Sequence, residues 1–205
     1  MKLHSDSFSH RQAIPSRFAM GRMGDTFSDN RNPQLAWSDA PERTQSFALL
    51  CIDPDVPTVA DMVGKAGVEI PIEQVRTEFV HWVMADIPAD VREIAEAAWS
   101  SGVTIGGKHD LQGSHAARHG LNSYTDWFAG NKDMAGDYLG YDGPFPPSND
   151  LRVHRYFFRL FALDVAHLDL PSRFTASDVL HAMQGHLLVE ALTYGTYSLH
   201  PAHAP

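Results

Sequence analysis

Three short segments combine titratable side chains with a backbone that proline makes rigid. One is Gly-Pro-Phe-Pro-Pro at 143–147, which His154 and Tyr156 follow after a short polar loop. The second is Asp-Pro-Asp-Val-Pro at 53–57, and the third is an apolar stretch that contains His81. Because side chains alternate along a strand, His154 and Tyr156 share a face if their segment is extended. Two imidazoles, a carboxylate and a phenol are groups that could bind a phosphate or another small anion.

Each of these segments also has a purely structural interpretation. The 53–57 segment is typical of a rigid turn after a strand, with the aspartates as caps. His81, between Val80 and Trp82, is typical of a hydrogen-bonded core residue, and Tyr156 of a residue bonded near a strand start. The functional interpretation requires the three segments to converge in space, so both interpretations stay open at this point.

Other histidines make a weaker case for a metal site. His115 and His119 are four residues apart and would share one face of a helix, with His109 nearby. Gly113 and Gly120 disfavour a helix there, and the sequence has no His-Glu-x-x-His motif. We therefore expect these to be exposed loop histidines, and we expect neither a metal nor another cofactor.

No segment presents an activated nucleophile. The sequence has no Gly-x-Ser-x-Gly motif, and its one cysteine, Cys51, lies in the apolar stretch 47–52, where a small core residue is expected. The glycine-rich segment 102–108 lacks the spacing of a phosphate-binding loop. The sequence therefore predicts no catalytic residue and a protein that is not an enzyme.

The composition is that of a globular domain with an acidic balance. A chain of 205 residues is long enough for one domain over 1–205 with a substantial core. The formal net charge of -9 opposes non-specific binding to nucleic acid or to an anionic membrane surface. We read neither a membrane-spanning apolar run nor a secretory signal, so we expect a cytoplasmic protein without stable membrane insertion.

The elements that must position these side chains are mostly short strands. Apolar runs rich in aromatic and β-branched residues predict strands at 47–52, 78–85, 155–163 and 193–199. Thr175 and Asp178 form a capping-box pattern, and apolar residues at three- and four-residue spacing extend the predicted helix to 192. Gly185 inside that helix suggests close backbone packing, and a weaker helical pattern covers 90–99. This order of elements favours a mainly β, antiparallel architecture with helical additions.

Two connections are unusually long for a compact domain. Residues 58–76 read as an insertion between two strands. Residues 102–140 form a second connection rich in glycine, histidine and asparagine. Connections of this length are usually functional or mobile. The family resemblance given below implies that they lie beside the pocket, where they would cover it, widen it or form a partner surface.

The motifs together resemble the phosphatidylethanolamine-binding protein family, also called Raf kinase inhibitor-like proteins. The matching motifs are Asp-Pro-Asp-Val-Pro at 53–57, His81-Trp82, Gly-Pro-Phe-Pro-Pro at 143–147 and His154-Arg155-Tyr156. The segments 14–18, 32–37, 182–186 and 195–197 resemble the prokaryotic branch. The resemblance runs in order from about Leu3 to Leu199. One departure is Val80, where some members carry a second histidine before the pocket one.

The resemblance implies a β-sandwich of two antiparallel sheets with short C-terminal helices and a small anion pocket at one end. In the family this pocket holds phosphate, acetate or the phosphoethanolamine head group. The residues that would form it here are Asp53, His81, Gly143, Pro144, His154 and Tyr156, with Asp55 and Pro57 shaping the neighbouring wall. A cis peptide bond before Pro57 or Pro146 is a further hypothesis.

The leading prediction is therefore a non-enzymatic protein that binds a small phosphorylated or carboxylated ligand. His81 and His154 would donate to the anion, Tyr156 would add a hydroxyl donor, and Asp53 would orient an imidazole or meet a ligand ammonium. Binding should then change between about pH 5 and 8 as the histidines titrate. Two alternatives stay open: an inhibitor that binds a kinase or protease, and a hydrolase with a histidine general base. A homodimer is also compatible with the resemblance.

Overall fold

The structure is a computed structural model that describes residues 1–205 except 25, 110, 112–116 and 204–205. Its elements, in chain order, are β1 (Lys2–His4), η1 (Ser16–Phe18), β2 (Gly21–Arg22), β3 (Thr26–Phe27), β4 (Leu35–Ser38), β5 (Ser46–Pro57), η2 (Ala60–Met62), β6 (Arg76–Pro88), β7 (Glu93–Ile94), β8 (Arg118–His119), α1 (Tyr124–Trp127), β9 (His154–Leu163), α2 (Ala176–Ala182) and β10 (Leu187–Tyr197). Strands dominate the described chain, which confirms the predicted mainly β class.

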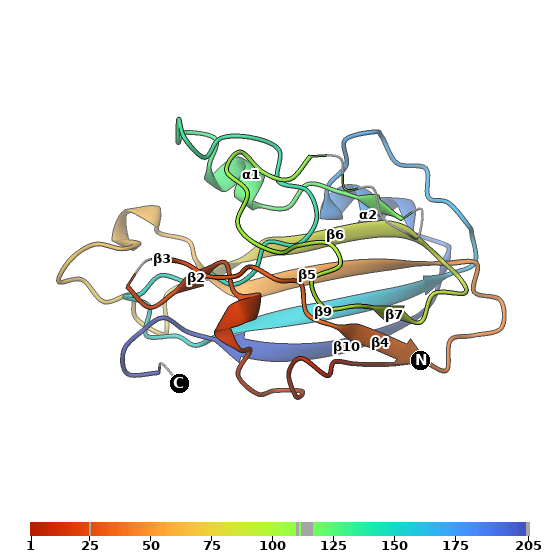
Figure 1. Cartoon of the computed structure of the whole chain (residues 1–205), viewed down its shortest axis with the longest axis horizontal. Coiled ribbons are helices and arrows are strands. Elements are labelled where there is room, and N and C mark those ends of the chain that lie inside the picture. The colour runs from red at the N-terminus through yellow and green to blue at the C-terminus, as the bar shows by residue number, and fades with distance from the viewer. Residues whose placement is uncertain (25, 110, 112–116, 204–205) are drawn as a thin grey trace.

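The long strands form one antiparallel sheet with the order β10-β9-β5-β6-β8. Figure 1 shows these strands running side by side along the length of the molecule. β5 lies at its centre, between β9 and β6, and its side chains from Ser46 to Asp53 are buried on both faces. The predicted strands at 47–52, 78–85 and 155–163 are confirmed, and each is longer or begins earlier than predicted.

A second, three-stranded antiparallel sheet with the order β1-β4-β7 completes a sandwich, and β2 and β3 form a separate hairpin. Because side chains alternate along β5, Phe47 and Leu49 point into the core between the two sheets. Ala48 and Leu50 point to the other face, under α2. The predicted antiparallel sandwich is therefore confirmed, with a core on each face of the central sheet.

The predicted C-terminal helix begins where expected but ends early. The Thr175 backbone N–H donates to the Asp178 carboxylate at 2.8 Å, as the capping-box pattern predicts. The helix ends at Ala182, and the apolar residues from Leu187 onward belong to β10, so the predicted helix to 192 is wrong. Gly185 has φ +84 and open space around its Cβ position, so it serves the turn into β10 and not close packing.

Three further local predictions are wrong. Residues 90–99 form turns and the two-residue strand β7, not a helix. The 53–57 segment does not end a strand: β5 continues to Pro57 with an irregular register between Asp53 and Val56. The described residues contain no cis peptide bond, so Pro57 and Pro146 both follow trans bonds.

One end of the sandwich carries most of the irregular chain. Figure 1 shows η2 and the β2–β3 hairpin at the left, and α1 above them, at the same end of the long strands. The 58–76 segment contains η2, and the 102–140 segment contains β8 and α1. None of the described helices is long and apolar enough to cross a membrane. The single-domain boundaries over 1–205 remain a prediction.

Candidate functional site

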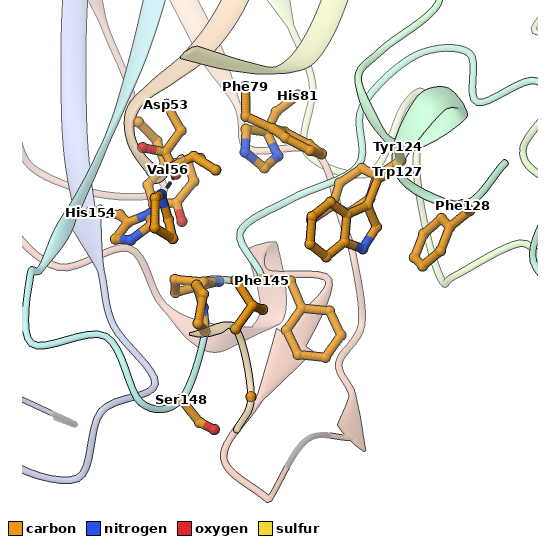
Figure 2. A pocket seen from close by; sticks show the side chains of 16 residues that line it. Asp53, Val56, Phe79, His81, Tyr124, Trp127, Phe128, Phe145, Ser148 and His154 are labelled. Atoms are coloured by element: carbon orange, nitrogen blue, oxygen red, sulfur yellow. Dashed lines mark hydrogen bonds and ion pairs between the residues drawn. The ribbon is translucent and has the colours of Figure 1, made fainter. Parts of the chain in front are cut away.

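A cavity of about 250 Å³ opens at this end of the sandwich. Figure 2 shows Asp53 and His154 on one side, His81 and Phe79 on a second, and Trp127 and Phe145 facing them. The three segments singled out by the sequence therefore converge. The lining residues are Asp53, Val56, Pro57, Val63, Gly64, Phe79, His81, Tyr124, Trp127, Phe128, Phe145, Pro146, Pro147, Ser148, His154 and Tyr156.

Asp53 and His154 come from the neighbouring strands β5 and β9 and are hydrogen-bonded in the cavity wall. His154 Nδ1 donates to Asp53 Oδ2 at 2.7 Å. The second ring nitrogen, Nε2, donates to Asp150 Oδ2 at 3.1 Å. Asp150 is paired in turn with the Arg76 guanidinium, at 2.5 and 3.0 Å. Each of these four side chains thus has a buried partner of opposite charge.

This arrangement makes His154 an imidazolium at neutral pH. Burial alone would lower the pKa of His154, but the Asp53 and Asp150 carboxylates outweigh it and raise the pKa to about 9. Both N–H groups are then donors, and both are used by carboxylates of the protein. His154 therefore has no free donor for a ligand, unlike its predicted role. Its effect on the cavity is indirect, because it fixes the position of Asp53 and balances the charge of that carboxylate.

Asp55 lies behind the cavity wall and not on it. Its carboxylate accepts from the Arg155 guanidinium at 2.8 and 2.9 Å and from Arg152 Nη1 at 3.1 Å. Burial would raise the pKa of Asp55, but these hydrogen bonds to Arg155 and Arg152 lower it overall. The Asp55 backbone N–H donates to Asp53 Oδ1 at 2.8 Å, so Asp55 helps to fix the pocket carboxylate.

His81 owes its orientation to a bulge in β6. Cys51 of β5 pairs with Trp82 and Ile52 pairs with Val80, so His81 is the extra residue between them. His81 Nδ1 donates to the Asp142 backbone carbonyl at 2.8 Å. A carbonyl only accepts, so Nδ1 carries the hydrogen, and Nε2 of the neutral ring has a free lone pair.

The pKa of His81 is lowered overall, whereas that of His154 is raised. Burial lowers the pKa of His81, and the nearby Asp53 and Asp142 offset this only in part. At neutral pH the ring is therefore uncharged, and its Nε2 accepts hydrogen bonds. Once protonated, the same atom becomes a donor. Of the two pocket histidines, His81 is the one whose second ring nitrogen can change from acceptor to donor on protonation, because both nitrogens of His154 are held by carboxylates.

Tyr156 contributes the unpaired donor of the cavity. Its side chain is buried, and its hydroxyl lies near the Asp53 carboxylate but makes no hydrogen bond of ordinary geometry among the described residues. Burial, with the nearby Asp53 charge, holds the pKa of Tyr156 well above its usual value. The hydroxyl therefore stays protonated. A buried polar group without a partner is costly unless a ligand or water satisfies it.

Gly143 and Pro144 lie beside the cavity but do not line it. Gly143 N–H donates to Asn30 Oδ1 at 2.8 Å, and its carbonyl accepts from the Tyr124 hydroxyl at 2.9 Å. A Cβ at this position would lie 2.1 Å from the Phe18 carbonyl oxygen. Glycine is required there by the close approach of Phe18, and ligand contact at Gly143 and Pro144 stays a prediction.

The outer part of the cavity is apolar. Phe79, Trp127, Phe128 and Phe145 line it, and Trp127 is 50% exposed. Val63 and Gly64 come from the 58–76 segment, and Trp127 and Phe128 come from the 102–140 segment. Both long connections therefore supply pocket wall. Pockets for small organic ligands combine such apolar walls with a few polar groups at the base.

Several functional neighbours were not identified from the sequence. They are Asp142, which holds His81; Asp150 and Arg76, which complete the His154 network; and Lys108, Asn30 and Asn122, which hold Asp142. Asp150 lies four residues before His154, and this short spacing is the one sequence signal that could have identified a member of this set. The others reach the site from distant loops.

A metal interpretation gains no geometric support in the described part of the chain. No group of three or more His, Cys, Asp or Glu side chains there could hold a metal ion. His109 is exposed, as predicted, but His119 lies on β8 with both ring nitrogens buried, so its prediction as an exposed loop histidine is wrong. His115 lies outside the described residues.

Comparison with known proteins places these features in a family. The profile described as Phosphatidylethanolamine-binding protein matches residues 4–198. Among curated relatives, a "UPF0098 protein" of Methanothermobacter thermautotrophicus is 34% identical over 96% of this chain and 98% of its own length. The "UPF0098 protein YbhB" of Escherichia coli is 28% identical over 97% of this chain and 100% of its own.

Solved structures show the same fold. A phosphatidylethanolamine-binding protein homologue from Chlamydia trachomatis superposes with a TM-score of 0.66 and 27% identity, covering 96% of each chain. Escherichia coli YbcL superposes with a TM-score of 0.70 at 23% identity, covering 96% of this chain and 97% of its own. The likeness to YbcL concerns the fold alone.

Proposed function

This chain belongs to the phosphatidylethanolamine-binding protein family, in its prokaryotic branch, and we propose that its pocket reversibly binds a small phosphate- or carboxylate-bearing ligand without chemical turnover. One observation carries the proposal: three polar groups with unused hydrogen-bonding capacity meet at the base of one cavity. They are the Tyr156 hydroxyl, His81 Nε2 and the remaining lone pairs of the Asp53 carboxylate, whose two oxygens each already accept one hydrogen bond. A small polar ligand would complete all three.

Each of the three groups has a distinct part in binding. Tyr156 donates to a ligand oxygen, which relieves the cost of its unpaired hydroxyl. His81 takes up a proton and donates from Nε2, because an anion stabilises the charged ring. The Asp53 charge should weaken the binding of a bare anion such as sulfate without abolishing it, and a ligand that also carries an ammonium donor should bind more tightly. The apolar wall around Trp127 accommodates the organic part of such a ligand.

Binding should therefore be coupled to uptake of one proton by His81. Sulfate is a suitable probe because it does not titrate between pH 6 and 8, whereas a phosphate monoester has a pKa of about 6. Above the pKa of the free His81 ring, the sulfate association constant should fall about tenfold per pH unit. Calorimetry in buffers of different ionisation enthalpy measures both the affinity and the proton count. Flat affinity, with no proton taken up, would contradict the role of His81.

A Tyr156→Phe variant tests whether the Tyr156 hydroxyl binds the anion at the bottom of the pocket. Loss of a hydrogen bond to a charged ligand should weaken sulfate binding tenfold or more. Because the hydroxyl has no partner in the free protein, the midpoint of urea unfolding should stay unchanged or rise. Unchanged affinity in this variant would place the anion elsewhere. Comparing the affinities of phosphoethanolamine and sulfate tests whether a ligand ammonium group binds at Asp53.

The two alternative functions stay predictions. A hydrolase would have to use His81 as its base, because both nitrogens of His154 are occupied by carboxylates. Small esters and phosphomonoesters test this, with His81→Gln as the control. A kinase or protease partner would be retained by the protein in a manner that depends on Tyr156. A homodimer is tested by sedimentation of the free protein.

A further inference from the structure

The backbone of Asp142 clamps His81 from two directions. Asp142 N–H donates to the His81 carbonyl at 3.0 Å, and the Asp142 carbonyl accepts from His81 Nδ1 at 2.8 Å. The next residue, Gly143, is held through both of its own backbone groups. Asp142 is thus the residue that fixes both the tautomer and the position of the pocket imidazole.

The Asp142 side chain is a fully buried carboxylate with one cationic partner among the described residues. Its Oδ1 accepts from Lys108 Nζ at 2.5 Å and from Asn30 Nδ2 at 2.8 Å. Its Oδ2 accepts from Asn122 Nδ2 at 2.9 Å. Lys108 is itself only 8% exposed. Burial of a lysine is rare unless it is paired, and here the pair lies directly behind the pocket histidine.

The backbone conformation of Gly107 positions Lys108 next to Asp142. The preceding Gly107 has φ +86, and a Cβ on it would lie 2.1 Å from the Asp137 carbonyl oxygen. Only glycine allows the chain to pass so close to Asp137. The glycine-rich segment 102–108 lacks the spacing of a phosphate-binding loop. Its structural role is to place the Lys108 ammonium group next to Asp142, behind the pocket histidine.

Several charged or titratable groups face His81. They are Asp53 from β5, His154 and Tyr156 from β9, Tyr124 from α1, and Asp142 from the loop before β9. Asp53 is balanced by His154, and Asp142 is balanced by Lys108. The two carboxylates would each favour the protonated ring. Each is offset by a buried cation, so the state of His81 depends on both ion pairs.

We propose that Lys108 is a positioning residue of the pocket: by neutralising the buried Asp142 carboxylate, it sets the pH range in which His81 can become a ligand donor. This inference rests on the proposed function, because it names a determinant of the same site. Lys108 does not touch the ligand. It acts through Asp142, so its removal changes the field at His81 without changing the cavity wall.

The test is a double-mutant cycle on the ligand-free protein, read out by NMR titration of His81. His81→Gln identifies the His81 signal among the twelve histidines. Lys108→Gln keeps a donor to Asp142 but removes the charge, and should raise the pKa of His81 by about one unit. Asp142→Asn leaves the Lys108 charge unbalanced and should lower the pKa. The double variant should return it towards the wild-type value.

Opposite shifts that cancel in the double variant cannot arise from a merely structural bridge. If Lys108 only ties its loop to Asp142, Lys108→Gln would leave the His81 titration unchanged, and the proposal would be overturned. Shifts of the same sign in both single variants would also overturn it. Lys108→Met, with an unfolding midpoint measured beside it, provides a second uncharged variant if Lys108→Gln folds poorly.

Sulfate binding then separates this inference from the proposed function. In Lys108→Gln, the pH at which sulfate affinity begins to fall should rise by the same interval as the pKa of His81. If His81 shifts as expected but the wild-type protein binds neither sulfate nor phosphoethanolamine, the proposed function fails, and only the effect of Lys108 on the pKa of His81 stands. If sulfate binds with proton uptake but His81 does not respond to Lys108, only the inference fails.

Discussion

Replacing His154 by alanine is expected to lower the free energy of unfolding by about 3–5 kcal/mol at pH 6.5. The substitution removes the cationic partner that lies between two buried carboxylates, at 2.7 Å from Asp53 and 3.1 Å from Asp150. Asp150 keeps its pairing with Arg76, but Asp53 is left buried without a counter-charge. Urea unfolding followed by circular dichroism measures the difference.

An exposed histidine near a buried carboxylate provides the matched control. The His167 side chain is 82% exposed and lies 3.5 Å from Asp86. Such an ion pair contributes little in water, so His167→Ala should change stability by no more than about 0.5 kcal/mol. Equal effects of the two alanine variants would contradict the buried network around His154.

The same network gives the protein an alkaline limit. The folded-state pKa of His154 is about 9, above the value near 6.5 of an unfolded chain. The stability it contributes is therefore fully present below about pH 6.5 and is lost as pH rises through about 9. The loss should be on the order of 3 kcal/mol in the wild type. This alkaline slope should be absent in His154→Ala.

His119 is expected to set an acid limit of similar size. Both of its ring nitrogens are buried without hydrogen-bond partners among the described residues, and its ring lies 4.5 Å from that of Trp99. Burial lowers the pKa of His119 to about 4, with Lys108 adding to the shift. Its contribution is therefore present above about pH 6.5 and lost as pH falls through about 4. The loss should be on the order of 3 kcal/mol.

A His119→Phe variant isolates this effect from other acid titrations. Phenylalanine keeps an aromatic ring beside Trp99 but cannot take up a proton. Its stability should lie close to that of the wild type at pH 7 and exceed it at pH 4.5. Urea midpoints at pH 7, 5.5 and 4.5 measure the difference, with His119→Leu as a second variant in case the phenyl ring does not fit. Parallel loss of stability in all three proteins would show that His119 does not control the acid limb.

The mainly β, antiparallel class could be predicted from the strand patterns, whereas the two-sheet sandwich was predicted from the family resemblance. The short apolar runs in β5, β6 and β9, rich in aromatic and β-branched residues, favour strands over helices. The helix predicted to reach residue 192 failed for a physical reason. Leu187, Leu188, Ala191 and Leu192 fit a helical spacing, but the positive φ of Gly185 turns the chain, and pairing with β9 makes the segment a strand.

The site was predicted in part. Asp53, His81, His154 and Tyr156 do line one cavity, and residues 145–147 form part of its wall, but Gly143 and Pro144 do not line it. The sequence could not show that both nitrogens of His154 are bound by carboxylates, because Asp150 reaches it only in the folded chain. Nor could it show the bulge that isolates His81, since a bulge depends on strand register. The roles proposed for Asp142 and Lys108 could not be predicted either, because they depend on both side chains being buried next to each other in the folded chain.

The central claim is that His81 becomes a donor when an anion occupies the pocket, and the ¹⁵N chemical shift of His81 Nε2 tests it most directly. At pH 7 the free protein should show a bare Nε2 and a protonated Nδ1, the latter held by the Asp142 carbonyl. Saturating sulfate should convert Nε2 to a protonated nitrogen, while Nδ1 keeps its hydrogen. If sulfate saturates the protein and Nε2 remains bare, the proposed proton-coupled binding at His81 is wrong.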